Sequence, residues 1–221
     1  MAEVTVRRVK VWDGWIRLFH WSVVMLLAVS WVSIKTGNAE VHYLSGYAVL
    51  TLLLFRIAWG VAGSDTARFA RFLRSPLAGL RHLAGFRRRE PDTEIGHNAA
   101  GGWLVLAMLA ALLFQAGTGL FSDGDGGARG PLAEHVGQAT GDWLTGWHHR
   151  GWWLLLALVG LHILLVLAYA AVKRHDLVRP MVTGKKRLPA NMRQPRFASP
   201  LLALAIVAVS AGLVWALVQF G

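Results

Sequence analysis

The stretch that decides the fold is WHHRGWWLLLALVGLHILLVLAYAAV, residues 147–172. From residue 152 to 172 it is an unbroken apolar run, close to the roughly 20 residues that a helix needs to cross a bilayer. His148 and His162 are 14 residues apart. On an α-helix this separation returns to within about 40° of the same face, roughly 21 Å further along the axis. One membrane helix is therefore expected to present two imidazoles at two depths.

Four other runs have the same character, at about residues 16–34, 43–61, 101–121 and 200–218. Their continuity predicts helices, because transmembrane β-strands give short alternating segments. The chain is 55% hydrophobic and only 16% charged, with a mean hydropathy of +0.44. This composition excludes an ordinary soluble domain and a disordered chain. The first run is interpreted as an uncleaved span, because no small-residue cleavage site follows it before Lys35.

The charge, +11 overall, gathers on one side of the predicted membrane. The segments on that side carry Arg7, Arg8, Lys10 and Arg17; then Arg68, Arg71, Arg74, Arg81, Arg87, Arg88 and Arg89; then Lys173, Arg174, Arg179, Lys185, Lys186, Arg187, Arg193 and Arg196. The other side carries only three basic residues, Lys35, Arg129 and Arg150, and it holds Glu40, Asp123, Asp125, Glu134 and Asp142. It also contains a polar, Gly-rich segment at 122–145 that is expected to form an outer cap or docking loop. The bias predicts a cytoplasmic N-terminus and a periplasmic C-terminus. Topology and contact with anionic lipid explain the positive charge, so no nucleic-acid partner is expected.

Histidines at membrane depth need a partner or a cofactor. His20 and His162 fall in the inner half of their spans, and His42 and His148 lie toward the outside. These four residues predict two bis-histidine sites stacked across the membrane. His20 and His162 lie at the same depth only if the first span begins before Arg17 or the fourth continues past residue 173. Without nearby Asp, Glu or Cys, two imidazoles make a poor closed zinc site and suit a six-coordinate haem. The chain has no cysteine, which excludes iron–sulfur clusters and covalent haem attachment.

Other readings of these histidines stay open at this point. Each could simply hydrogen-bond a neighbouring helix, serve as a proton relay in a non-haem transporter, or be incidental in a structural anchor. His149 points about 140° away from the face of His162. His82, His135 and His175 fall in predicted loops and are expected to be solvated.

Three further residues are candidates for the inner site. Arg56 is 14 residues after His42, so it either approaches a haem propionate or snorkels to the surface. Arg17 is a second candidate propionate partner. His97 precedes the third span and is expected either to titrate near neutral pH beside a quinone, or to cap the helix or bind a propionate.

Several motifs occur in an order that resembles one family. They are VWDGWIRLFHW (11–21), VHYLSGYAVLTLLLFRIAWGVAGSDTARF (41–69), GHNAAGGWLVLAML (96–109), WHHRGWWLLLALVGLH (147–162) and VKRHDLVRPMVTGKK (172–186). Together they are similar to the bacterial cytochrome b561 / Ni,Fe-hydrogenase b-type cytochrome family. The resemblance implies that His20, His42, His148 and His162 ligate two b-type haems, in the pairs His20/His162 and His42/His148. The adjacent His149 leaves the choice between it and His148 open.

The resemblance also implies a function and an architecture. We expect an all-α, four-helix haem-binding bundle over residues 1–187, followed by a basic linker and a fifth transmembrane helix over 188–221 that has no counterpart in the family core. Such a protein in the bacterial inner membrane carries electrons between quinone and a periplasmic redox partner, either a c-type cytochrome or a dehydrogenase or hydrogenase. A superoxide:quinone oxidoreductase of the same fold is the alternative.

Overall fold

The computed structural model describes residues 5–88, 90–124 and 128–220. Arg89 and Asp125, two of the charges used to predict the topology, lie outside the described residues. All five predicted helices are present and are long and apolar enough to cross a membrane. They are α1 (Gly14–Lys35), α2 (Ala39–Ala62), α5 (Ala99–Leu120), α6 (Gln138–Ala168) and α8 (Pro200–Phe220). A π-helical segment, Tyr169–Lys173, continues α6.

Side-chain caps fix where three of these helices begin. Asp13, Asn38 and Asn98 accept hydrogen bonds from backbone amides in the first turns of α1, α2 and α5. α1 begins at Gly14, before Arg17, and this is one of the two conditions under which His20 and His162 lie at the same depth. The prediction of a loop over 122–145 is wrong for its last part, since α6 already begins at Gln138. The first turns of α6 are polar, so a search for apolar runs does not detect them.

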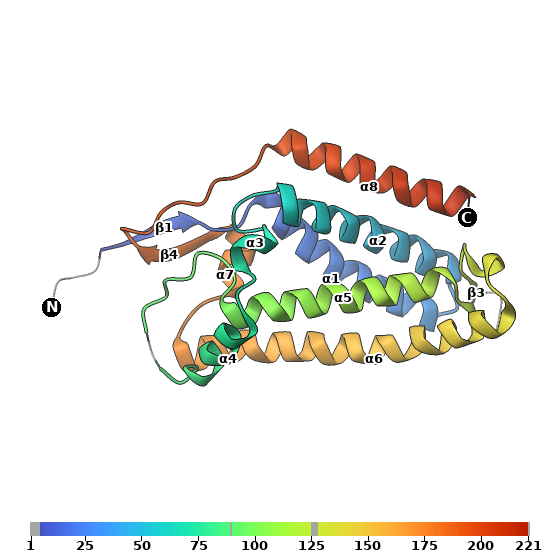
Figure 1. The fold of residues 1–221 in the computed structure, drawn as a ribbon, viewed down its shortest axis with the longest axis horizontal. Helices are drawn as coiled ribbons and strands as arrows, with labels where there is room; N and C mark the ends of the chain where they lie inside the picture. Colours follow the sequence, from blue (N-terminus) through green and yellow to red (C-terminus); the bar gives the residue numbers. More distant parts are fainter. Residues whose placement is uncertain (1–4, 89, 125–127, 221) are drawn as a thin grey trace.

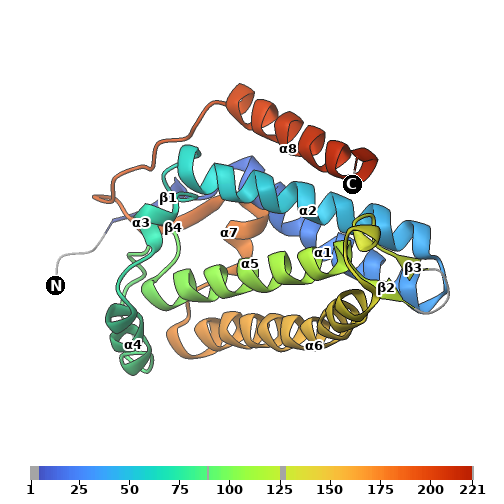
Figure 2. The ribbon, with the colours of Figure 1, turned by 45° about the vertical axis from the view of Figure 1, so that its right-hand side comes forward.

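The helices pack as two antiparallel hairpins with one additional helix outside. α1 packs against α2, α5 packs against α6, and α2 meets α5 between the hairpins. α8 lies along the outer side of α2 (Figures 1 and 2). Leu53 of α2 and Leu155 of α6 are almost fully buried in the apolar cluster at the centre of the bundle. A second cluster, around Phe55 and Trp59, lies toward the end that carries the N-terminus.

Short strands and helices close the two ends of the bundle. β1 (Val6–Lys10) pairs antiparallel with β4 (Lys185–Pro189), and β2 (Asp123–Gly124) pairs with β3 (Ala128–Arg129). The prediction of an all-α chain overlooked both ladders, because β1 and β4 are short, strongly charged strands without a clear apolar alternation. Position 187, the expected end of the core domain, falls within β4. The remaining short helices are α3 (Phe69–Phe72), α4 (Pro76–Ala84), a 3₁₀ turn (Ala133–His135) and α7 (Val178–Thr183).

Candidate functional site

Four of the nine histidines face one another in two pairs. The ring centres of His20 on α1 and His162 on α6 are 6.3 Å apart, at an interplanar angle of 56°. Those of His42 on α2 and His148 on α6 are 6.1 Å apart, at 89°. The structure thus brings together the residues that the depth argument paired. His149 is exposed, and its ring centre lies 6.5 Å from that of His148 on the same helix.

The spacing within each pair fits a metal held between two imidazoles. A metal–imidazole bond is about 2 Å long, so two opposed ligands place their ring centres roughly 6 Å apart once both half-rings are added. In the part of the chain that the structure describes, no group of three or more His, Cys, Asp or Glu side chains is placed to hold a metal ion. A six-coordinate ion at either pair would take its other four ligands from outside this set of side chains. A haem iron, with four porphyrin nitrogens, meets this requirement.

Backbone carbonyls orient the His42–His148 pair. Nδ1 of His42 lies 2.9 Å from the Ser30 carbonyl oxygen, and Nδ1 of His148 lies 2.9 Å from that of Gln115. Donation from Nδ1 to a carbonyl fixes the tautomer and leaves Nε2 as the ligating nitrogen. The Gln115 side-chain amide is 3.3 Å from His148 Nε2 and would have to withdraw for a metal to bind there.

Two glycines shape the space around this pair. A Cβ added at Gly119 of α5 would lie 2.8 Å from Cε1 of His148, so only a glycine lets α5 approach the imidazole this closely. A Cβ added at Gly46, one turn after His42, would have nothing within 4 Å. Gly46 therefore borders open space on the side of α2 that carries His42.

The His20–His162 pair has a different setting. Nδ1 of His20 is buried and has no hydrogen-bond partner among the described residues. Arg17, three residues earlier, donates from one guanidinium nitrogen to the Val182 carbonyl oxygen at 2.6 Å. α7, which carries Val182, therefore lies against the first turns of α1, and the predicted propionate partner Arg17 is partly engaged with it.

Arg56 does not snorkel to the surface, because only 3% of the residue is exposed. Its guanidinium carbon lies 4.8 Å from the centre of the Phe69 ring, and within the described chain its Nη1 has no hydrogen-bond partner. Asp13 interacts with it electrostatically, but the carboxylate of Asp13 also accepts hydrogen bonds from Trp59 Nε1 and the Ile16 amide. A buried cation that lacks a full set of partners favours an anion beside it. A haem propionate is such an anion.

His97 is enclosed by aromatic rings. Its ring centre is 4.8 Å from that of Trp12 and 4.7 Å from that of Phe72, and its buried Nδ1 finds no partner in the described residues. Burial, followed by the nearby Arg56 and His162, lowers the pKa of His97 to about 3. The expectation that His97 titrates near neutral pH is therefore wrong for this structure, and its imidazole is neutral at pH 7.

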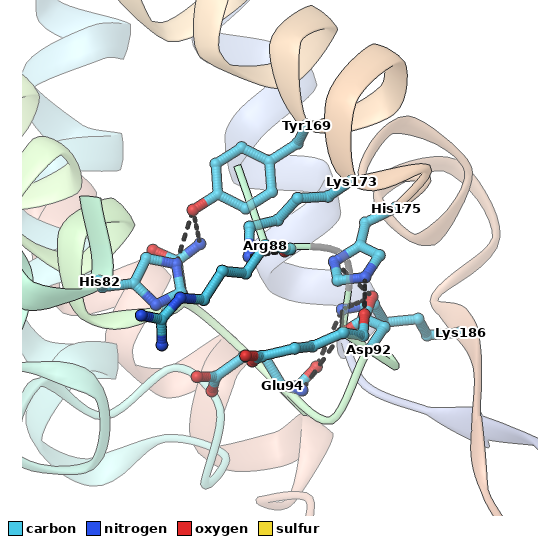
Figure 3. A network of polar contacts seen from close by, with 10 residues as sticks. His82, Arg88, Asp92, Glu94, Tyr169, Lys173, His175 and Lys186 are labelled. Atoms are coloured by element: carbon cyan, nitrogen blue, oxygen red, sulfur yellow. Dashed lines mark hydrogen bonds and ion pairs between the residues drawn. The ribbon is translucent and has the colours of Figure 1, made fainter. Parts of the chain in front are cut away.

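Sequence reasoning missed a polar network at the C-terminal end of α6, the end nearer His162 (Figure 3). The Tyr169 hydroxyl forms hydrogen bonds with His82 Nε2 at 2.6 Å and with the Asn98 side-chain amide at 3.0 Å. Nearby, His175 Nε2 donates to the Glu90 carbonyl oxygen at 2.9 Å. Solvation was thus a wrong expectation for His82 and His175, whereas His135 is exposed. The usable signal was the position of Tyr169, two helical turns after His162 and on nearly the same face.

Comparison with known proteins identifies the family. The model of the prokaryotic cytochrome b561 family matches residues 11–184. The chain belongs to this family. It is therefore a membrane cytochrome of the b type, an electron-transfer protein whose cofactor is b-type haem.

The curated relatives of this cytochrome carry one name. A "Probable Ni/Fe-hydrogenase B-type cytochrome subunit" of Bradyrhizobium diazoefficiens is 22% identical over 81% of this chain and 86% of its own length. Proteins of the same name from Cupriavidus necator and Azotobacter vinelandii are 23% and 24% identical, over 81% and 80% of this chain and 87% of their own lengths. No solved structure matches the chain.

Proposed function

We propose that this cytochrome carries electrons across the membrane through two b-type haems, one ligated by His20 and His162 and the other by His42 and His148. The observation that carries this proposal is the pair of facing histidine couples, with ring centres 6.3 and 6.1 Å apart. When bound, each haem iron supplies reversible one-electron chemistry. The chain supplies the ligands and holds the two sites about 21 Å apart along α6.

The two ends of this path have different partners in the proposal. Quinone exchanges electrons at the His20–His162 end, where His97, Arg56 and Arg17 gather. Neutral His97 offers a hydrogen bond to a quinone oxygen, but it holds no proton for release at pH 7. The hydrogen-bonded group His82–Tyr169–Asn98, near the same end of α6, is the candidate route for protons.

A periplasmic redox protein is proposed to dock at the His42–His148 end. The names of the curated relatives favour a hydrogenase-type enzyme over a c-type cytochrome as this partner. Glu40 and Asp142 are exposed at this end and suit a partner with a basic docking face, whereas the exposed Glu134 is paired with Arg129 at 2.8 Å. The positive-inside bias supports the orientation, in a bacterial inner membrane with the N-terminus in the cytoplasm.

Haem counting tests the proposal. The purified protein should contain two haems per chain by the pyridine haemochrome assay and show b-type bands in reduced-minus-oxidised spectra. His162→Ala should lose one haem and keep the other, because His162 is the α6 histidine that faces His20. His149→Ala is the matched control on the same helix and should keep both. One haem in the wild-type chain, or loss of a haem in His149→Ala but not in His148→Ala, would contradict the assignment.

A further inference from the structure

A basic cavity of about 260 Å³ lies at the end of the molecule that carries the β1–β4 ladder. Its lining joins β1, the exit from α6, α7 and β4, segments far apart in the sequence. The charged and titratable side chains that line it are Arg8, Asp92, Arg174, His175, Asp176, Arg179, Lys185, Lys186 and Arg187. Six of these are Arg or Lys and two are carboxylates, so the cavity carries a strong positive excess.

Both carboxylates in the lining already have partners. Asp92 accepts from Lys186 Nζ at 2.6 Å, and His175 Nδ1 lies 3.8 Å from it (Figure 3). Asp176, just before α7, accepts hydrogen bonds from the Val178 and Arg179 amides, at 3.1 and 2.9 Å. Among the described residues, no side-chain hydrogen bond or ion pair is formed by the five remaining cations, Arg8, Arg174, Arg179, Lys185 and Arg187. The cavity thus concentrates positive charge that Asp92 and Asp176 offset only in part.

The backbone holds these cations together against their repulsion. In the ladder, Arg8 lies directly opposite Arg187, and Lys10 lies opposite Lys185. Like charges placed opposite each other destabilise a strand pair. Arg174 is the single non-glycine residue with a positive φ, 58°, in the described chain. Left-handed residues of this kind commonly end helices, and Arg174 ends the π-helical segment at the exit of α6, which fixes its place at the cavity. An anion in the cavity would relieve this crowding of charge.

Apolar surface adjoins the cations. Val178 and Val182 of α7 are 52% and 56% exposed, and they flank Arg179, which lines the cavity. α7 is joined to α1 by the hydrogen bond that Trp21 Nε1 donates to the Met181 carbonyl oxygen. Trp21 itself is 43% exposed on a membrane helix. The cavity therefore opens beside a surface that suits acyl chains, with Trp21 placed as an interfacial tryptophan.

We propose that this cavity binds the phosphate headgroup of an anionic phospholipid, whose acyl chains lie along α7 and the start of α1. Phosphate offers the acceptor oxygens that several guanidinium groups can share. Basic pockets at the cytoplasmic side of membrane helices have this function in general. The proposed topology decides only which leaflet supplies the lipid. The binding itself requires neither haem nor quinone.

Lipid binding to the purified, full-length protein tests this inference. The delipidated protein in neutral detergent is titrated with phosphatidylglycerol, phosphatidylcholine of the same acyl chains, or inorganic phosphate, and bound species are counted by native mass spectrometry. The test variant is Arg174→Gln/Arg179→Gln/Arg187→Gln. The control, Arg81→Gln/Arg87→Gln/Arg88→Gln, removes the same charge at the same end of the molecule but outside the cavity. Absorbance spectra check that each variant keeps the haem content of the wild type.

Saturable binding of one phosphatidylglycerol is expected in the wild type and the control, with phosphatidylcholine much weaker. The test variant should bind phosphatidylglycerol on the order of 100-fold more weakly at low salt, since three cations are lost. Equal weakening in both triple variants would reduce the effect to general surface charge and overturn the site. Phosphate binding as tight as that of the lipid would make it a free-anion site instead. If the triple variant does not fold, equal wild-type affinity for the two lipids still refutes the proposal.

Discussion

Replacing Gly119 by alanine tests how closely α5 supports the His42–His148 pair. The added Cβ would lie 2.8 Å from Cε1 and 3.1 Å from Nδ1 of His148, closer than a Cβ packs without movement. The imidazole would have to shift, and a shift strains its 2.9 Å hydrogen bond to the Gln115 carbonyl oxygen. Such overpacking costs about 1–3 kcal/mol. Glycine-to-alanine replacement within a helix returns about 0.5–1 kcal/mol.

That gain stabilises the helix whether or not haem is bound, so the overpacking cost of about 1–3 kcal/mol acts on the ligand and corresponds to roughly 5- to 160-fold weaker binding of one haem. Gly117→Ala is the matched control, two residues earlier on the same helix, where an added Cβ meets nothing within 4 Å. Haem-to-protein ratios and redox titrations should show one haem depleted or shifted in Gly119→Ala and both unchanged in Gly117→Ala. Full retention of two unperturbed haems in Gly119→Ala would refute the assignment of His148 as a ligand held against α5.

Three other predictions concern the opposite end of the bundle. His97→Ala should keep its haems and slow haem reduction by a quinol in membranes, and an unchanged rate would exclude His97 from the quinone site. Because the pKa of His97 is about 3 when folded and near 6.5 when unfolded, its contribution to stability is complete above pH 6.5 and is lost as pH falls toward 3. The loss is at most about 1.4 kcal/mol per pH unit. In His97→Gln, the free energy of unfolding should depend on pH less steeply between about pH 3 and 6.5, by the equivalent of one proton. Identical slopes in the two proteins would argue against a buried neutral imidazole at position 97. Arg56→Met removes a positive charge and should lower one haem midpoint potential by on the order of 50 mV, with Arg56→Lys closer to wild type. Equal potentials in all three proteins would show that Arg56 does not interact with a haem.

The histidine pairs were accessible to sequence reasoning because helical geometry is regular. A separation of 14 residues on one apolar helix fixes both a common face and a difference in depth, whatever the rest of the fold does. The same rule placed Arg56 at inner depth. It could not decide whether the guanidinium snorkels, since that depends on Asp13, Phe69 and Trp59, which come from other segments.

Features built from long-range contacts were out of reach. The β1–β4 ladder pairs residues about 180 positions apart, and its charged strands lack the alternation that identifies a half-buried strand. His82 and His175 looked like loop residues because their partners, Tyr169 and the Glu90 carbonyl, are supplied by other elements. The low pKa of His97 likewise arises from tertiary burial, which composition does not reveal.

The arrangement of the bundle as two hairpins has a consequence for how the protein is made. Each histidine pair takes one member from the α1–α2 hairpin and one from the α5–α6 hairpin. A haem held by both members of a pair therefore spans the seam between the hairpins, and its binding energy contributes directly to their association. Each hairpin satisfies its own backbone hydrogen bonds and is able to enter the bilayer by itself. Insertion would then precede cofactor capture, and haem supply during biogenesis would set how much of the inserted chain matures.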